Sequence, residues 1–145
     1  AARALPSRGM QFSVKRQLTV ALQNQPGRLA EISQVIATSG INIEALCVVD
    51  NVEQGVVRLL VDDPARCKEL LIEDGFYVVE AEVLAIHLTD RRGKLAAVTK
   101  ALAASQINID YAYSTVDHVQ AATLLVMKVS NIRLAEKVLT QIETD

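Results

Sequence analysis

The sequence predicts an α+β protein made of two tandem β-α-β-β-α-β units with antiparallel sheets, the second unit lacking its last strand. The chain repeats itself at a constant offset of 66 residues, so that Gly27 matches Gly93 and Asn42 matches Asn108. Within each repeat, strand-like alternation gives way to helical spacing of apolar residues. The second repeat stops where a fourth strand would begin.

The repeat is extensive. Residues 18–61 and 84–127 align without a gap at twelve identical positions, namely Leu18, Leu22, Gly27, Leu29, Ala30, Ala37, Ser39, Ile41, Asn42, Ile43, Gln54 and Leu59. A fixed period of this length indicates two copies of one small unit. Because the copies keep apolar spacing, one glycine and one asparagine, they predict a shared fold and a binding corner rather than a catalytic centre.

The first strand and the first helix of copy one are separated by a turn. Residues 14–23 alternate apolar and polar side chains, which predicts a strand, and Pro26 with Gly27 predicts the turn. Apolar residues then recur at helical spacing, at Leu29, Ile32, Val35 and Ile36. Gly40 suits the left-handed cap that ends such a helix.

A hairpin follows, with strands over Ile41–Asp50 and Gly55–Val61 and a turn over Asn51–Gln54. Asp63 suits the N-cap of a second helix and Pro64 its first position.

This second helix is expected to end near Asp74, before Gly75, and Phe76–Glu80 begins a fourth strand. The order of elements is the split-βαβ, ferredoxin-like pattern.

The second copy starts without a linker, since Phe76–Leu88 contains no glycine, proline or polar run. Its expected elements are a helix carrying Leu95, Val98 and Leu102, strands over Ile109–Thr115 and Ala121–Val129, and a helix from Asn131 to about Glu143. We expect residues 1–9, which precede Met10, to be a remnant foreign to the native chain. The two domains are then residues 10–80 and 81–145.

The missing strand leaves the edge of the Ala85–Leu88 strand open unless another segment covers it. Two segments could fill the place: Gln11–Val14 of the same or another chain, or a strand of a second subunit. Since small units of this kind bury little surface alone, we expect at least a homodimer.

Composition excludes several classes of function. The chain has 145 residues, half of them apolar, and a net charge of −2, which argues against nucleic acid. It has no apolar run of membrane-spanning length and no secretory signal, so a cytoplasmic protein is expected. Cys47 and Cys67 lack metal-ligand spacing and are expected to be free, buried thiols. No metal or cofactor is predicted.

No catalytic constellation is visible, so we expect no enzyme activity. His87 and His118 are the two histidines, and neither has a neighbour that would make it a base. Tyr111 and Tyr113 alternate on one strand, as base-stacking aromatics do in RNA-binding proteins, but the strand has no basic face and packing is the simpler explanation.

The strand-to-helix corner at Gly27 is a candidate binding site. Free backbone N–H groups at a helix start favour a carboxylate, and glycine lets a ligand approach the backbone. Asn24 offers both a donor and an acceptor, which suits the polar head of an amino acid. The simpler alternatives are a tight turn at Gly27 and a turn-capping role for Asn42.

At these residues the chain resembles the ACT-domain family. Asn24-x-Pro26-Gly27-x-Leu29, followed by Gly40, Ile41, Asn42 and Ile43, is similar to the family motif. Residues 14–129 as a whole resemble the tandem ACT-domain proteins of bacteria. Copy two keeps Gly93, Leu95, Ile107, Asn108 and Ile109 but departs at Asp90, Arg92 and Gln106.

The resemblance implies a regulatory protein that binds a small amino acid at an interface between paired domains. The ligand-binding residues it implies are Asn24, Gln25, Pro26, Gly27, Arg28, Leu29, Asn42 and Ile43. The weaker candidates of the second copy are Asp90, Gly93, Lys94, Leu95 and Asn108. Two alternatives are a regulatory subunit that docks onto an enzyme of amino-acid metabolism and an oligomerisation module without a ligand. A long exposed apolar helix face would favour the docking subunit.

Overall fold

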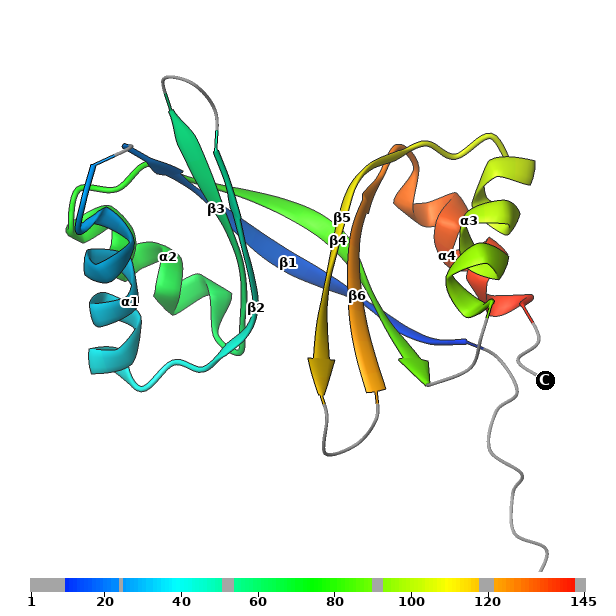
Figure 1. The fold of residues 1–145 in the computed structure, drawn as a ribbon, viewed down its shortest axis with the longest axis horizontal. Coiled ribbons are helices and arrows are strands. Elements are labelled where there is room, and N and C mark those ends of the chain that lie inside the picture. The colour runs from blue at the N-terminus through cyan, green and yellow to red at the C-terminus, as the bar shows by residue number, and fades with distance from the viewer. Residues whose placement is uncertain (1–9, 24, 51–53, 90–92, 118–121, 143–145) are drawn as a thin grey trace, which may run out of the picture. The chain divides into compact units, whose positions relative to one another are not determined.

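The computed structural model describes residues 10–23, 25–50, 54–89, 93–117 and 122–142 (Figure 1). Its strands are neighbours in the order β2-β3-β1-β4-β6-β5. The elements are β1 (Gln11–Leu22), α1 (Arg28–Ser39), β2 (Ile43–Val49), β3 (Gly55–Val61), α2 (Pro64–Glu73), β4 (Val78–Thr89), α3 (Lys94–Ala104), β5 (Ile109–Asp117), β6 (Ala122–Val129) and α4 (Ile132–Thr140). The predicted α+β fold of two repeated units is confirmed.

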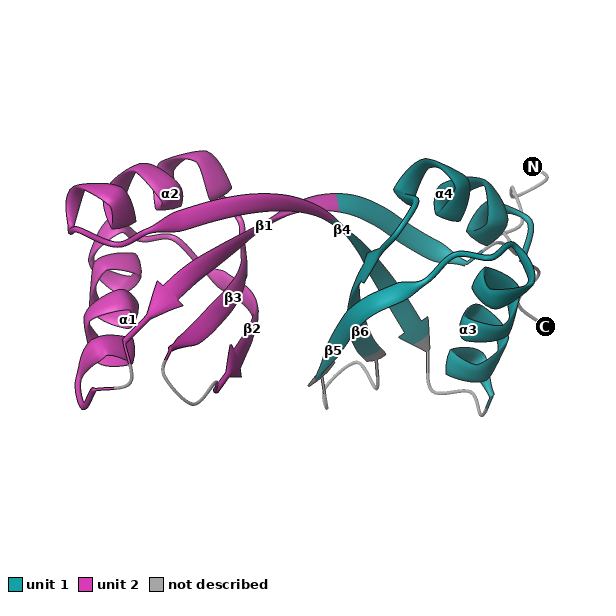
Figure 2. Cartoon of the chain, turned by 90° about the horizontal axis from the view of Figure 1, so that it is seen from above, with its two compact units in different colours: residues 1–14, 83–145 teal, residues 15–82 magenta. Residues whose placement is uncertain are grey.

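The chain divides into two compact units (Figure 2). One consists of Lys15–Glu82, and the other combines Val83–Asp145 with the segment that ends at Val14. The domain limits expected from the repeat, residues 10–80 and 81–145, follow sequence similarity and stay a prediction.

In the unit of residues 15–82, the strands are neighbours in the order β2-β3-β1-β4, and α1 and α2 lie on one face of them (Figure 1). β1 pairs antiparallel with β3, and β3 pairs antiparallel with β2. The core lies between the helices and this face and contains Leu18, Val20, Ile32, Ile36, Val57, Leu59, Leu71 and Phe76. Burial of these side chains is the main stabilising contribution to the unit.

In the other unit, β4 pairs with β6 and β6 with β5, both antiparallel. The neighbour of β4 on its other side is β1. Met10 is buried in the core of this unit, and Phe12 and Val14 pack against the same core. The N-terminal segment of the same chain therefore occupies the place of the missing fourth strand, which is the first of the two expected alternatives. The edge of the Ala85–Leu88 strand is therefore covered by the chain itself, and the expected homodimer is not needed to cover it.

The predicted helix boundaries have the expected chemical basis. Asp63 accepts a hydrogen bond from the backbone N–H of Arg66 at 3.2 Å, and Pro64 opens α2. Asn131 does the same at α4, where its Oδ1 accepts from Leu134 N–H at 3.1 Å. α4 ends at Thr140, earlier than the expected limit near Glu143. The predicted turn at Asn51–Gln54 lies mostly outside the described residues.

One part of the sequence alignment is wrong. Ile43 pairs with Val61 in the first unit, and Ile109 pairs with Val129 in the second, so the offset grows from 66 to 68 across the hairpin turn. The matches at Gln54 and Leu59 are therefore not structural equivalents. A longer hairpin in copy two accounts for the shift, because β5 and β6 each exceed their counterparts in length.

Candidate functional site

The glycine corner, which we define as residues 25–29, connects β1 to α1. Gly27 is the N-cap residue of α1 and adopts φ 92° and ψ −10°, in the left-handed region that favours glycine. A Cβ atom placed there would meet no atom of the described chain within 4 Å. The backbone conformation, rather than crowding, thus requires glycine, and the space beside it is open to a ligand.

The first turn of α1 has backbone N–H groups that precede the helical ladder, of which Arg28 N–H donates to the carbonyl of Gln25 at 3.4 Å. The helical ladder begins with Glu31 N–H, which donates to the carbonyl of Gly27 at 3.0 Å. No described side chain caps this end of α1. The N–H groups that precede the ladder, together with the helix dipole, form a site that favours an anion.

Arg28 places a positive charge at the same end of α1. Its guanidinium lies over the ring of Phe76, with 4.9 Å between Cζ and the ring centroid. Its Nη1 donates to Glu31 Oε2 at 2.9 Å, while its Nε is buried without a hydrogen-bond partner among the described residues. The sequence did not reveal this arrangement, because Phe76 belongs to the other end of the unit in sequence.

The leucine that follows Arg28 is exposed in both copies. Leu29 is 37% exposed and its equivalent Leu95 is 52% exposed, although Ile32 and Ile36 of the same helical series are buried. The expected core face of α1 therefore starts at Ile32. Leu29 is free to contact a ligand or a neighbouring molecule.

Asn42 and Ile43 lie at the other end of α1. The backbone N–H of Asn42 donates to Asp62 Oδ1 at 3.0 Å, and its carbonyl accepts from Asp62 N–H at 3.1 Å. α1 has twelve residues and is therefore about 18 Å long. The structure does not bring Asn42 to the glycine corner within one unit. The side chain that caps this turn is that of Asp62, which accepts from the backbone N–H of Asn42.

The equivalent corner of copy two has the same backbone conformation as the glycine corner. Gly93 adopts φ 83°, and Ala97 N–H donates to its carbonyl at 2.9 Å. The backbone N–H of Asn108 donates to Ser130 Oγ at 2.9 Å, and the side-chain amide of Asn108 donates to Asp110. Lys94 and Leu95 open α3. Asn24 and Asp90, the two polar candidates, lie outside the described residues.

The edge strand β2 differs from its counterpart β5 in what it exposes. Leu46 is 39% exposed and Val48 is 45% exposed. The equivalent positions of β5 are Ala112 and Ser114, which are also exposed. The fold of copy two therefore has small side chains at these positions, where copy one has large apolar ones.

Titratable groups show no sign of a catalytic centre in the described ranges. His87 is exposed on β4, and His118 lies outside these ranges. No group of three metal-ligating side chains occurs in the part of the chain that the structure describes. Burial, with smaller contributions from Asp63 and Asp62, raises the pKa of the Cys67 thiol to about 11. Cys47 is a half-buried free thiol.

None of the described helices combines the length and the apolar character that crossing a membrane requires.

Comparison with known proteins agrees with the fold of the chain. A sequence model of the family described as ACT domain pair matches residues 12–144. The crystal structure of protein BT0572 from Bacteroides thetaiotaomicron is 33% identical over 92% of this chain and 89% of that one, with a TM-score of 0.81. No curated protein matches the chain.

More distant structures share the fold alone. The ligand-free regulatory subunit of aspartate kinase from Thermus thermophilus is 17% identical, with a TM-score of 0.66 over 90% of this chain and 92% of that one. A structure of aspartokinase alpha and beta subunits is 18% identical, with a TM-score of 0.61 over 90% of this chain and 94% of that one.

Proposed function

Because the chain belongs to the family of ACT domain pairs, we propose that it is a non-enzymatic regulatory protein that binds a small amino acid at the glycine corner of copy one. The observation that carries the proposal is Arg28. Arg28 opens α1 directly after Gly27, and its buried Nε has no hydrogen-bond partner among the described residues.

The charges of the corner suit both charges of an α-amino acid. The ligand carboxylate would accept from backbone N–H groups of the first turn of α1 and from Arg28. Glu31 lies 2.9 Å from Arg28 and is half exposed, so its carboxylate can accept from the ligand ammonium. Asn24 would hold the polar head from the end of β1, as the sequence motif implies.

A second copy of the chain would complete the site. Leu29 is exposed at the corner, and the β2 edge exposes Leu46 and Val48. Self-association through this edge would satisfy its unpaired backbone groups and bury both apolar side chains. Ligand binding would then regulate by favouring one arrangement of subunits, since only a difference in affinity between two states shifts their equilibrium.

The described helices favour the sensor over a subunit that docks onto an enzyme. Each of these helices has one large exposed apolar side chain, namely Leu29, Ile72, Leu95 or Leu134. One residue on each helix does not form the long apolar face that we expected of a docking subunit.

Calorimetry with the twenty amino acids tests the proposal. We expect one of them to bind with a stoichiometry of one per chain, because copy two carries Asp90 in place of Asn24. Asn24→Ala should weaken that ligand about 10-fold, the loss of one polar contact in a desolvated site. The absence of binding by all twenty, or two equal sites per chain, would contradict the proposal.

A further inference from the structure

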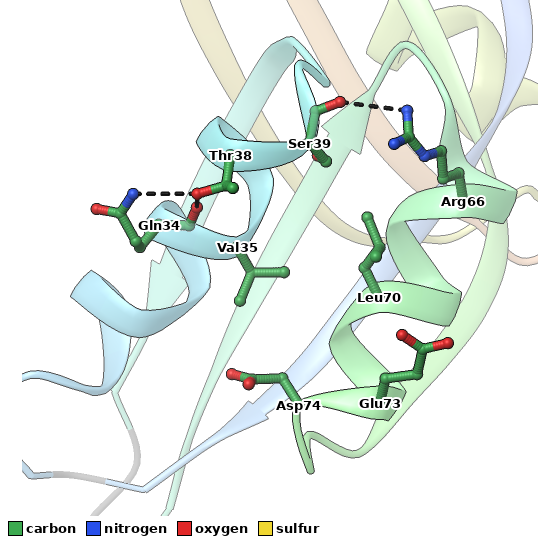
Figure 3. A pocket seen from close by; sticks show the side chains of 8 residues that line it. All are labelled: Gln34, Val35, Thr38, Ser39, Arg66, Leu70, Glu73 and Asp74. Atoms are coloured by element: carbon green, nitrogen blue, oxygen red, sulfur yellow. Dashed lines mark hydrogen bonds between the residues drawn. The ribbon is translucent and has the colours of Figure 1, made fainter.

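A second site lies between the two helices of the unit of residues 15–82. It is an open groove of about 620 Å³, lined by the second half of α1 and by α2 (Figure 3). This volume falls in the range of small-molecule sites. The glycine corner contributes no residue to its lining, so the groove is a separate feature of the molecule.

The middle of the groove is apolar and its ends are charged. Val35 and Leu70 point toward each other across it, and both pack against the core (Figure 3). Arg66 lies at one end, near Ser39, and Glu73 and Asp74 lie at the other (Figure 3). A ligand that fills the groove would therefore contact opposite charges at its two ends.

The acidic end is electrostatically unbalanced. Glu73 is the last residue of α2 and Asp74 is its C-cap, where the helix dipole disfavours negative charge. The last turn of α2 holds no basic residue, and no ion pair joins either carboxylate to another described residue. A positively charged group bound here would relieve this repulsion.

The basic end has N–H donors beyond the one that a described residue engages. Arg66 Nη1 donates to the carbonyl of Ser39 at 3.2 Å, at the end of α1. A guanidinium has five N–H donors, and this contact engages one of them. The others can donate to a carboxylate.

The distance between the two ends selects the ligand. Along α2, Arg66 and Glu73 are separated by a rise of about 10 Å. The two charges of a free α-amino acid are too close together to reach both ends. An extended peptide spans roughly 3.3–3.6 Å per residue, so about three residues match the distance.

We propose that the groove binds a short peptide of about three residues with free termini. Its ammonium lies against Glu73 and Asp74, its carboxylate against Arg66, and an apolar side chain on Val35 and Leu70. This activity goes beyond the proposed function and does not depend on it.

Copy two serves as an internal comparison. Counting from the N-caps Asp63 and Asn131, the equivalents of Arg66, Glu73 and Asp74 are Leu134, Gln141 and Ile142. The same pair of helices thus folds without any of the three charges. The three charges are therefore not a requirement of the shared fold, and they are available to a ligand in copy one.

Calorimetry on the full chain with the tripeptide alanyl-leucyl-alanine tests the proposal. We expect one site per chain, and at least about 10-fold weaker binding when the peptide is N-acetylated or C-amidated, because each change removes one charge-assisted contact. No binding of the free peptide, or equal binding of the blocked peptides, would overturn it.

Variants locate the site. Glu73→Gln with Asp74→Asn, and separately Arg66→Gln, should each weaken the tripeptide about 10-fold. Glu69→Gln, which removes an exposed charge of α2 outside the groove, should not. Since Arg66 also bonds to Ser39, thermal unfolding should show that Arg66→Gln is folded at the temperature of the titration. Unchanged affinity in the folded variants would place the peptide elsewhere and overturn the assignment.

Gly27→Val separates the two proposals. It should leave tripeptide affinity unchanged while it abolishes amino-acid binding. Loss of both ligands in the folded variant would show that the groove is not a separate site.

Discussion

The guanidinium Cζ of Arg28 lies 4.9 Å from the centroid of the Phe76 ring. The ring belongs to the core, where Phe76 is 5% exposed, so the Arg28 guanidinium at the start of α1 packs on a buried aromatic ring. Such a contact orients the guanidinium and adds a cation–π attraction of about 0.5–1 kcal/mol at a partly exposed site. The position of the charge at the glycine corner therefore depends on a residue far away in sequence.

The first prediction concerns this contact. Phe76→Leu keeps an apolar side chain in the core but removes the ring face, so it should cost about 1 kcal/mol of unfolding free energy. Amino-acid affinity should fall several-fold, since Arg28 loses its orientation. Urea unfolding and calorimetry measure the two effects. As a control, Ile41→Val changes the same core at the opposite end of α1 and should leave affinity unchanged.

The second prediction compares the two glycine corners. Gly27→Val and Gly93→Val each force a side chain into a positive φ, at 92° and 83°, and should destabilise the protein by at least about 1 kcal/mol. Only Gly27→Val should abolish amino-acid binding. Calorimetry on both variants checks this, and an equal loss of affinity in the two would show that the effect is general strain.

The third prediction concerns pH. Burial raises the pKa of Cys67 from 9.0 to about 11, so the folded state keeps the thiol proton where the unfolded state loses it. Stability from this group is complete below pH 9 and is lost as pH rises toward 11, by up to about 2 kcal/mol. Cys67→Ala should remove this slope from urea-unfolding curves measured between those pH values. Cys47→Ala should retain it.

The fourth prediction concerns the N-terminal segment. Phe12→Ala removes a side chain that packs against the core of the second unit, and should destabilise it by about 2–3 kcal/mol, less than a fully buried phenylalanine. Removal of residues 10–14 should cost more and promote aggregation, because it opens the edge of β4. Thermal unfolding and light scattering report both outcomes. A truncated chain as stable and soluble as the intact one would contradict the assignment of this segment.

The fifth prediction concerns assembly. Val48→Lys places a charge on the apolar β2 edge and should shift a dimer toward monomer, as lysines on edge strands do. Ser114→Lys is the matched control on β5 and should leave the assembly unchanged. Sedimentation of the parent protein and both variants at micromolar concentration measures their oligomeric states. A monomeric parent protein would remove the basis of the proposed assembly.

Local chemistry made most of the fold predictable. Asp63 and Pro64 define the start of α2 because they satisfy the requirements of a helix N-terminus by themselves, and Gly40 ends α1 with φ 78°. The lack of any turn residue in β4 correctly predicted one continuous strand. These features depend on a few adjacent residues, which is why the sequence alone reveals them.

Relationships between distant residues were not predictable. The stacking of Arg28 on Phe76 has no counterpart in local pattern, and neither does the groove that α1 and α2 form. The motif suggested that Asn42 lies near the glycine corner, yet α1 separates the two within one unit. The gapless alignment of the two copies did not reveal the two-residue shift. Leu59 and Leu125 are identical at the offset of 66, although the structural offset of these strands is 68.

The strands β1 and β4 each run through both units without a break. In β4, Val78 packs into one core while Leu84, Ile86 and Leu88 pack into the other, and all four have even numbers. In β1, Phe12 and Val14 serve one core and Leu18 and Val20 the other, again at even positions. Along each strand, the core-facing side chains of both units therefore fall at the same alternate positions. A single inserted or deleted residue near position 82 would move the side chains of one of the two cores to the opposite face of the strand. An insertion or deletion of two residues would keep the core side chains on the same face. Evolutionary changes in the length of the strand at this junction should therefore involve an even number of residues.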